Sequence, residues 1–484
     1  MQVHDKLFIG GEWVAPATSA TIEVVSPHTE EIIARVPEAS AADVDHAVAA
    51  ARRAFDEGPW PRMEPAERAD VMAKVSQTIQ ARAQDYAETI TREMGSPISW
   101  SIMGQVFAST MVLDYYSGLA RTYPFEELRD GVLGNKALVR REAVGVAGAI
   151  VPWNVPLFVT MLKLGPAMAA GATVVLKPAP ETPLDAFLLA EALLEAGLPP
   201  GVVNIVPAGR EVGEHLVTHP GVDKIGFTGS TAAGKRIAAL CGEQLKRVTL
   251  ELGGKSAAII MDDADVGEVM PNLIGASLMN NGQACVAQTR ILASRDRYQD
   301  VVDALCEAVG RQQVGDPLDP ATTVGPLVAE RQRQRVEGYI AAGQEEGAKV
   351  AVGGGRPASQ ATGWYVEPTV FVNVDNHMTI AREEIFGPVL TVIPYDGIDD
   401  AVKIANDSDY GLSGSVWSAD NAAALDVARR VRTGTYTVNG FMLEFSCPFG
   451  GFKQSGVGRE LGPEGLAAYL EAKSISLPAG FEPI

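Results

Sequence analysis

Residues 146–156 read VAGAIVPWNVP, a short apolar run that ends in a proline, a tryptophan and an asparagine. The apolar part, residues 146–151, is typical of a buried strand. Four similar runs follow at residues 173–176, 202–206, 224–227 and 248–252, each separated from the last by a stretch with helical spacing of its apolar residues. Strands that alternate with helices predict a parallel, doubly wound sheet. The chain is therefore expected to be an α/β protein.

The residues with reactive or polar side chains stand at the ends of these runs. Trp153 and Asn154 follow the first run, Lys177 follows the second, Ser230 follows the fourth, and Glu251 lies at the end of the fifth. In doubly wound sheets, ligands bind outside the carboxyl ends of the strands. The sequence therefore predicts a functional site along this edge of the sheet.

The flanking parts of the chain predict an entry segment and a second domain. Two apolar runs around Gly10-Gly11 indicate a hairpin over residues 7–14, and strands follow at 21–25 and 31–36. Helical spacing extends from Ala41 to about Gly118, including runs at 71–87 and 98–119. After Gly254 the alternation resumes, so we expect a second α/β domain. Its predicted helices are 266–279, 298–312 and 328–346, and its predicted strands are 290–293, 366–374, 389–395, 414–417 and 435–438, with further β runs at 126–141 and 474–477.

Composition narrows the class of protein. A chain of 484 residues that is 46% hydrophobic and 21% charged fits two or three globular domains. The net charge of -20 disfavours a nucleic-acid partner, because such binding depends on clustered Lys and Arg. The first residues lack the pattern of a secretion signal, and the apolar runs are too short for a membrane span. The four cysteines form no CxxC pair, so we expect thiols and a cytoplasmic location.

Cys285 lies in the small-residue turn NNGQACVA, residues 280–287. A cysteine attacks as the thiolate, so a nucleophile needs a site that lowers its pKa, open access and a nearby base. Gly282 and Ala284 leave access to the sulfur. The alternative is a packing role, because unpaired cysteine is often buried. Glu251 and Asn154 favour the nucleophile, because they supply a base and an oxyanion donor.

A glycine-rich turn at residues 226–236, GFTGSTAAGKR, is suited to bring backbone N–H groups against a phosphate. Residues 229–235 also match the G-x-x-x-x-G-K of an ATP-binding loop. The next residue is Arg236, where that loop requires Ser or Thr to hold magnesium. An ATPase is therefore disfavoured, and a dinucleotide site or a purely structural turn remains.

Two other patterns are given structural interpretations. His215 and His219 share a helix face, but the glutamate of H-E-x-x-H and a third ligand are missing, so we expect a solvated face and no metal site. Glu383 and Glu384 are adjacent carboxylates. On a strand they would point to opposite faces, which disfavours a glycosidase-like pair.

Seven motifs in order resemble the NAD(P)-dependent aldehyde dehydrogenase superfamily over nearly the whole chain. They are PWNVP (152–156), KPAPETP (177–183), FTGST (227–231), ELGGKS (251–256), GQAC (282–285), EEIFGPV (383–389) and PFGGFKQSGVGRE (448–460). The resemblance implies an enzyme that oxidises an aldehyde to a carboxylic acid through a thiohemiacetal and a thioester on cysteine. It also implies a role for each motif residue.

By this resemblance Cys285 is the nucleophile, Glu251 the general base and Asn154 an oxyanion donor, with Lys163 and Glu460 as supporting polar groups. The dinucleotide would be held by residues from the strand ends and from the EEIFGPV motif. These are Val151, Pro152, Trp153, Lys177, Gly209, Gly213, Phe227, Gly229, Ser230, Leu252, Glu384 and Phe386.

The resemblance also implies an architecture and an assembly. A Rossmann-type dinucleotide domain would comprise 1–121 and 144–253, and an α/β catalytic domain would comprise 254–453. Residues 122–143 and 454–484 would form a small β oligomerisation element with the C-terminal segment, in a homodimer or homotetramer. Two alternatives remain: a CoA-acylating dehydrogenase, which typically lacks the base, and a non-catalytic binding or structural member, expected to lose Cys285 or Glu251.

Two sequence details concern specificity. Many NAD-preferring relatives have Glu three residues after the lysine, where this chain has Pro180. We therefore expect NAD+ to be preferred and NADP+ to be used measurably. The residues flanking the nucleophile and those near the substrate tunnel are small or aliphatic, which predicts a roomy apolar pocket. They are Ala284, Val286, Val155, Val159 and Leu162.

Overall fold

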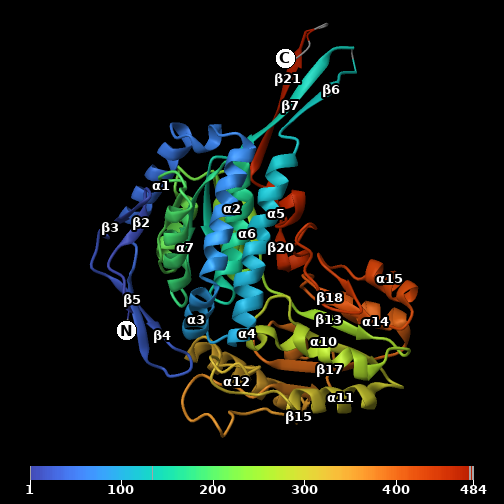
Figure 1. The fold of residues 1–484 in the computed structure, drawn as a ribbon. Helices are drawn as coiled ribbons and strands as arrows, with labels where there is room; N and C mark the ends of the chain where they lie inside the picture. The colour runs from blue at the N-terminus through green and yellow to red at the C-terminus, as the bar shows by residue number, and fades with distance from the viewer. Residues whose placement is uncertain (1, 133, 479–480, 482–484) are drawn as a thin grey trace.

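Two large sheets with helices on both faces form the body of the molecule, and a narrow three-stranded sheet projects from it (Figure 1). The computed structural model describes residues 2–132, 134–478 and 481. The predicted α/β class is confirmed. Among the described residues, no helix combines the length and apolar character needed to span a membrane.

The first sheet has eight strands, and its five central strands are parallel. These are the five runs for which a parallel sheet was predicted, and that prediction is confirmed. The predicted hairpin β2–β3 and the strand β20 join the two edges in antiparallel fashion, so the sheet as a whole is mixed. In spatial order the strands are β20 (Gly456–Val457), β12 (Arg247–Glu251), β11 (Lys224–Thr228), β8 (Val146–Ile150), β9 (Thr173–Lys177), β10 (Val203–Ile205), β2 (Leu7–Ile9) and β3 (Glu12–Val14).

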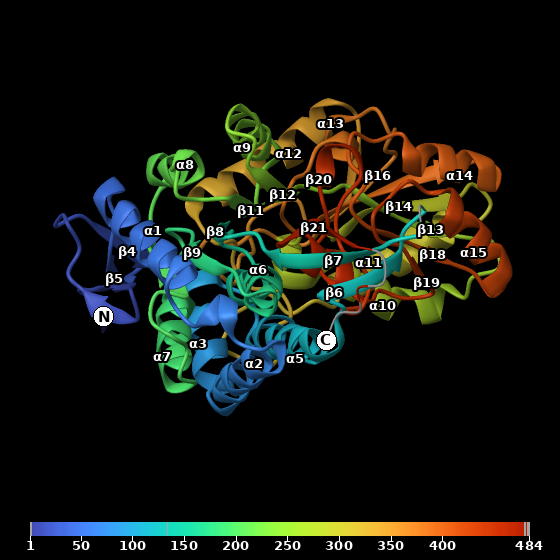
Figure 2. The same ribbon diagram turned by 90° about the horizontal axis from the view of Figure 1, so that it is seen from above.

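The two faces of this sheet are covered by different helices (Figure 2). Val146 and Ile150 of β8 pack against one helix group, whereas Ala147 and Ala149 pack against the other, as expected for alternating side chains on a strand. The first group is α1 (Ala41–Asp56), α8 (Arg210–Thr218) and α9 (Thr231–Glu243). The second group is α2 (Pro65–Ala81), α3 (Ala83–Met94), α5 (Ala108–Thr122), α6 (Pro156–Ala170) and α7 (Leu184–Glu195).

The strand order reverses at β8. From β8 the chain adds β9 and β10 on one side, then returns to add β11 and β12 on the other. The carboxyl ends of β8 and β11 therefore border the topological switch point, where doubly wound sheets bind ligands. Residues 151–154 and 228–230 follow these two strand ends.

The second sheet has seven strands and sits below the first in Figure 1. Its inner strand β13 (Ser256–Ile260), between β14 and β18, was not predicted, because Ser-Ala-Ala carries little β signal. The predicted strand at 366–374 is shorter, because only Thr369–Val372 pair. In spatial order the strands are β15 (Lys349–Val352), β16 (Thr369–Val372), β17 (Val389–Tyr395), β14 (Gln288–Ser294), β13, β18 (Gly414–Trp417) and β19 (Thr437–Val438).

Helices again pack on both faces of this second sheet. One face carries α10 (Val266–Leu278) and α11 (Tyr298–Gly310), and the other carries α12 (Glu330–Glu345), α13 (Thr379–Arg382), α14 (Gly397–Asn406) and α15 (Asn421–Arg430). The short helix α16 (Gly462–Ala467) precedes the last strand.

Two small sheets complete the fold. One contains β1 (Gln2–Val3), β5 (Ile32–Pro37) and β4 (Thr21–Val25). The other contains β21 (Leu470–Leu477), β7 (Lys136–Ala143) and β6 (Glu126–Asp130), and it projects from the body (Figure 1). The two isolated β runs predicted at 126–141 and 474–477 thus pair with each other. The predicted domain limits, 1–121 with 144–253, 254–453, and 122–143 with 454–484, stay a prediction.

The predicted helical runs at 71–87 and 98–119 are each divided. Arg82, at φ -111° and ψ 25°, separates α2 from α3. The second run begins as α4 (Ile98–Trp100), continues as the π-helical segment η2 (Ser101–Phe107) and becomes α5. Apolar periodicity cannot reveal either change, because the apolar face continues across both.

A pair of buried carboxyl groups joins α3 to α7. Glu93 is fully buried and accepts hydrogen bonds from the backbone N–H of Leu184 at 2.9 Å and of Asp185 at 3.4 Å. Burial raises the pKa of Asp185 to about 7 and holds that of Glu93 well above its usual range. A carboxyl whose pKa is raised on folding stabilises the folded state at low pH, and that contribution is lost as pH rises through the folded pKa.

We predict that Asp185→Asn changes the pH dependence of stability. The melting temperature of this variant relative to the unmodified protein should rise as pH increases from about 5 to about 8, because the variant lacks the Asp185 carboxyl and only Glu93 of the pair can still ionise. Thermal unfolding at several pH values measures this, with Asp114→Asn on the exposed side of α5 as the control. An identical pH dependence for Asp185→Asn and the unmodified protein would contradict the expected linkage.

Candidate active site

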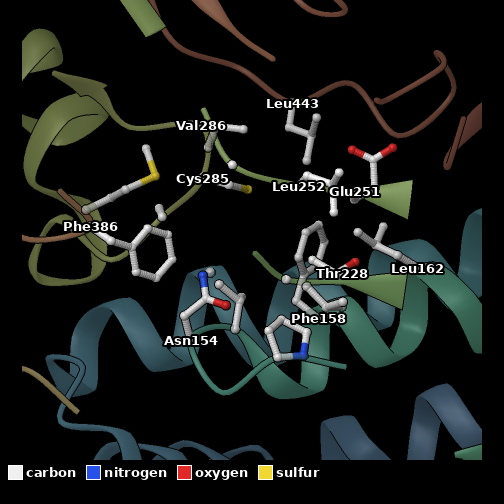
Figure 3. A pocket seen from close by; sticks show the side chains of 18 of the residues that line it. Asn154, Phe158, Leu162, Thr228, Glu251, Leu252, Cys285, Val286, Phe386 and Leu443 are labelled. Carbon is white, nitrogen blue, oxygen red and sulfur yellow. The ribbon is translucent and has the colours of Figure 1, made fainter. Parts of the chain in front are cut away.

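A cavity of about 560 Å³ lies between the two large sheets and beside the switch point (Figure 3). Its lining brings together Cys285, Glu251, Asn154 and Glu460, which the sequence placed in four separate motifs. The five small or aliphatic residues predicted to line an apolar pocket also line it, which confirms that prediction. They are Val155, Val159, Leu162, Ala284 and Val286.

Cys285 is carried by a turn with unusual backbone geometry. Asn280, Asn281 and Gly282 follow α10 with positive φ angles of 52°, 61° and 72°. Asparagine tolerates this left-handed region better than most residues. Gly282 is also required for space, because a Cβ there would lie 2.3 Å from the carbonyl of Gly387. The turn thus brings the residues before Cys285 close to the loop that precedes β17.

Asn154 lies between β8 and α6, and it is buried. Its side-chain Nδ2 donates to the backbone oxygen of Gln283 at 2.8 Å. Its own backbone oxygen accepts from Asn280 Nδ2 at 2.8 Å and from Gln105 Nε2 at 3.2 Å. One N–H of the Asn154 amide remains, because a primary amide has two. Figure 3 shows the side chains of Asn154 and Cys285 pointing into the same pocket.

Glu251 is the last residue of β12, and it is buried. Both of its carboxyl oxygens lack a hydrogen-bond partner among the described residues. Burial and the nearby charge of Glu460 hold the pKa of Glu251 well above its usual range, while Lys163 and Arg459 act in the opposite direction. A carboxyl with a raised pKa beside a cavity is suited to accept a proton.

Lys163 and Glu460 form a fully buried ion pair beside Glu251. Lys163 Nζ lies 2.8 Å from Glu460 Oε1 and donates to Thr228 Oγ1 at 2.6 Å. Lys163 comes from α6, Thr228 from the end of β11 and Glu460 from the C-terminal part of the chain. The predicted supporting pair is therefore in contact, and Thr228 is a partner that the sequence reasoning missed.

The pKa of Cys285 differs from the expectation. The sequence reasoning expected a site that lowers it, whereas burial, with the charges of Glu384 and Glu251, raises the pKa of Cys285 to about 12. The expectation was wrong for this structure because the sulfur is buried and the ionisable groups that act on it are carboxyls. A thiol in this site needs a base to become a nucleophile.

Seven of the predicted cofactor residues line the same cavity. The rings of Trp153 and Phe386 meet edge to face at 5.4 Å. Ser230 Oγ caps α9 by accepting from the N–H of Ala233 at 3.3 Å. The seven are Pro152, Trp153, Gly229, Ser230, Leu252, Glu384 and Phe386.

Glu384 reaches the cavity from the loop after α13. Its Oε1 accepts a hydrogen bond from the N–H of Gly254 at 2.9 Å. Burial raises the pKa of Glu384 to about 7. Its neighbour Glu383 is exposed and accepts from Tyr339 Oη at 2.6 Å. The two carboxylates point apart as expected, but they lie in a loop and not on a strand.

The remaining predicted cofactor residues continue along the same sheet edge, outside the cavity. They are Val151, Lys177, Gly209, Gly213 and Phe227. Lys177 Nζ donates to the backbone oxygens of Ala208 at 2.7 Å and Pro178 at 3.0 Å, so one of its three N–H groups remains for a ligand. Burial lowers the pKa of Lys177 to about 8.

Three observations indicate that this carboxyl edge of the first sheet is suited to bind a dinucleotide. The N-termini of α8 and α9 follow it, and helix N-termini favour phosphates. Glycines permit close approach: a Cβ at Gly213 would lie 3.3 Å from the Lys177 side chain. The edge also leads directly into the cavity that holds Cys285.

The two other sequence patterns have structural partners. Lys235 donates to Gln454 Oε1 at 3.0 Å and Arg236 pairs with Glu214, so neither side chain turns back over the glycine-rich turn as an ATP-binding loop requires. His215 and His219 both face Asp45, at 2.6 and 3.4 Å. In the described part of the chain no three His, Cys, Asp or Glu residues gather as a metal site would need.

A segment that the sequence reasoning missed forms one wall of the cavity. Phe441, Leu443 and Phe445 line the cavity, whereas the residues between them, Met442 and Glu444, are exposed. We call residues 441–446 the strap. Its alternation of apolar residues could have indicated an inward face, but it was not recognised because the strap forms no regular strand.

The comparisons with known proteins agree with this geometry. Residues 13–475 match the family model described as the aldehyde dehydrogenase family. The chain is 49% identical over 474 residues to geranial dehydrogenase of Castellaniella defragrans, which covers 98% of this chain and 99% of that protein.

Solved structures of aldehyde dehydrogenases have the same fold. The Mycobacterium tuberculosis aldehyde dehydrogenase in complex with NAD+ is 50% identical, with a TM-score of 0.98 and full coverage of both chains. A mutant of aldehyde dehydrogenase C from Pseudomonas syringae, in complex with NAD+ and octanal, is 43% identical with a TM-score of 0.95, covering 99% of this chain and 97% of that one. The protein therefore belongs to the aldehyde dehydrogenase family, an NAD(P)-dependent family whose general reaction is the oxidation of aldehydes to carboxylic acids.

Proposed function

We propose that this protein oxidises apolar aldehydes to carboxylic acids with NAD+, using Cys285 as a covalent nucleophile. The observation that supports this most directly is the shared cavity, which is lined by Cys285, Asn154 and Glu251 together with seven residues suited to hold a dinucleotide. The roles given to individual residues below are part of this proposal.

The dinucleotide would be held along the carboxyl edge of the first sheet. Lys177 and the N-terminus of α8 would hold its adenosine half, and Ser230, Glu384 and Phe386 the half nearer the cavity. When bound, NAD(P)+ supplies the acceptor for the hydride that the aldehyde carbon loses. The protein's contribution is to position this acceptor and exclude water.

In acylation, the sulfur of Cys285 forms a bond to the aldehyde carbon. The raised pKa of the thiol means that its proton must pass to a base. Glu251 and Glu384 are nearby carboxyls with raised pKa values, and Glu251 is favoured because neither of its oxygens has a hydrogen-bond partner among the described residues, whereas Glu384 accepts from Gly254. The remaining N–H of Asn154 and the backbone N–H of Cys285 would donate to the developing oxyanion, at roughly 3 to 4 kcal/mol for each such donor.

In deacylation, Glu251 removes a proton from water, whose oxygen bonds to the thioester carbon as the carbon–sulfur bond breaks. The acid leaves, and the sulfur regains a proton. The charges of Lys163 and Glu460 would adjust the pKa of Glu251, since Glu460 raises it and Lys163 lowers it. The presence of this buried base favours hydrolysis over transfer of the acyl group to CoA.

The substrate would be an apolar aldehyde. Phe158, Leu443 and Phe445 are among the apolar residues that line the cavity beside Cys285. The names of the relatives support this choice, since one is a geranial dehydrogenase and another was crystallised with octanal.

The proposal includes a homodimer or homotetramer in the cytoplasm. The projecting sheet β21-β7-β6 supports an oligomer, because β21 is an exposed edge strand with backbone groups available to a second copy. All four cysteines are free, which fits a reducing compartment.

Replacing the nucleophile gives the first test of this proposal. Cys285→Ala should abolish NADH formation from octanal while leaving the Kd for NAD+ unchanged, because it removes the sulfur and little else. Cys306→Ala and Cys447→Ala, at thiols outside the cavity, are the controls and should retain activity. Appreciable turnover by Cys285→Ala would overturn the covalent mechanism.

Replacing the base gives a second test. Glu251→Gln should lower steady-state turnover by roughly 10²- to 10⁴-fold, as expected for loss of general-base catalysis. In rapid mixing, the rate of the first turnover should rise with pH in this variant, because solvent must then ionise the thiol, whose pKa is raised by burial. The exposed carboxylate variant Glu383→Gln is the control. Unchanged turnover by Glu251→Gln would show that another group activates the water.

The strap offers a test of substrate class. Phe445→Ala should raise KM for octanal by roughly tenfold or more, because burial of a phenyl group contributes about 1.5 to 3 kcal/mol. KM for acetaldehyde should change less, since a two-carbon substrate has little apolar surface to bury. Met442→Ala, on the outward side of the same strap, should leave both values unchanged. Equal effects of Phe445→Ala on both aldehydes would contradict the apolar-substrate assignment.

A further inference from the structure

A carboxylate from the N-terminal part of the chain lies at the start of α8. Glu38 follows β5, and its side chain approaches Gly209, the residue that precedes α8. A Cβ built on Gly209 would lie 3.4 Å from Glu38 Oε1, which is van der Waals contact. Glu38 therefore faces the part of the sheet edge where Lys177 and Gly209 would hold the adenosine half of a dinucleotide.

The backbone fixes Glu38 in this position. The N–H of Glu38 donates to the oxygen of Ala20, and the N–H of Ala39 donates to the oxygen of Pro207, both at 2.9 Å. The second bond ties this segment to the loop that leads into α8. Ser40 then begins α1 with a capping box that includes Asp43. The backbone on both sides of Glu38 is thus held by hydrogen bonds.

Lys177 reaches the same place from β9. Its Nζ donates to the oxygen of Ala208, directly before Gly209, and its stem passes 3.3 Å from a Cβ built on Gly213. Burial lowers the pKa of Lys177, and the charges of Glu181 and Glu38 act in the opposite direction. Glu181 is already paired with Arg331, whereas within the described residues Glu38 forms no ion pair. Glu38 is the carboxylate left to act on a ligand.

A carboxylate at the adenosine end discriminates between the two dinucleotides. It accepts hydrogen bonds from the ribose hydroxyls of NAD+, and it repels the 2′-phosphate of NADP+. Many relatives place a glutamate three residues after the lysine for this purpose, but this chain has Pro180 there. A side chain from another element can take over the same electrostatic role.

We propose that Glu38 is the residue that sets the preference of this protein for NAD+ over NADP+, in place of the missing carboxylate at position 180. This assignment rests on the proposed dinucleotide site. With Pro180 the chain lacks the carboxylate that would favour NAD+ over NADP+ at that position, and Glu38 would supply one. Cofactor specificity would then depend on the connection between β5 and α1.

The test compares binding of NAD+, NADP+, 5′-ADP and 2′,5′-ADP to the full chain by isothermal titration calorimetry. Glu38→Gln keeps the shape of the side chain and removes its charge. We expect its affinity for NADP+ and 2′,5′-ADP to rise by roughly tenfold, and its affinity for NAD+ and 5′-ADP to fall by no more than about threefold. The gain should shrink at high salt.

Glu12→Gln is the control, because Glu12 is an exposed carboxylate in β3, outside the proposed dinucleotide site. The ratio of its affinities for NAD+ and NADP+ should stay that of the unmodified protein. An equal gain in Glu12→Gln would overturn the assignment by showing a general effect of net charge. An unchanged ratio in Glu38→Gln, with NAD+ binding intact, would overturn it directly. If the unmodified protein bound neither dinucleotide, the proposed function itself would fail, and this assignment with it.

Discussion

The hydrogen bond from Asn154 Nδ2 to the backbone oxygen of Gln283 joins the two halves of the site. Asn154 follows a strand of the first sheet, and Gln283 belongs to the turn between α10 and β14 of the second unit. The first unit contributes the side-chain amide of Asn154 to the cavity, and the second contributes the sulfur of Cys285. The cavity, the position of the sulfur and the direction of the free amide N–H all depend on how these two units pack together.

The buried charges depend on the same packing. Lys163 and Glu460 are fully desolvated, and such a pair is stable only when its remaining polar atoms are well placed. Thr228 supplies one partner, at 2.6 Å. Glu251 stands beside this pair with both oxygens free of partners among the described residues. An unpaired buried carboxyl is costly for stability, and this cost is consistent with a group kept for proton transfer.

Much of the fold and the residue content of the site could be predicted from the sequence. The strand-end positions of Asn154, Ser230 and Glu251 followed from the alternation of strands and helices, which is a local pattern. The strand β13 was missed because Ser-Ala-Ala is a weak β former, and its place between β14 and β18 is decided by tertiary pairing. The pairing of residues 126–141 with 474–477 could not be predicted either, because the two segments are far apart in sequence and local patterns do not show which strands pair.

The electrostatics of the site could not be predicted at all. The pKa of Cys285 depends on burial by residues from both units and on carboxyls more than thirty residues away in sequence. The same limit applies to Glu38, which no motif marks. It acquires a role only because β5 and the loop before α8 are tied together by a backbone hydrogen bond.

The π-helical segment η2 has a consequence for how one wall of the cavity can change. Trp100, Gly104 and Ala108 line the cavity from three successive turns, while Met103 and Phe107 are exposed to solvent. A π-helical turn holds one residue more than an α-helical turn, so loss of a single residue there would rotate the preceding side chains by about 100°. The shape of this wall is thus controlled by chain length as well as by side-chain size. A deletion in this segment, far from Cys285 in sequence, would exchange residues that line the cavity and leave the reacting groups in place.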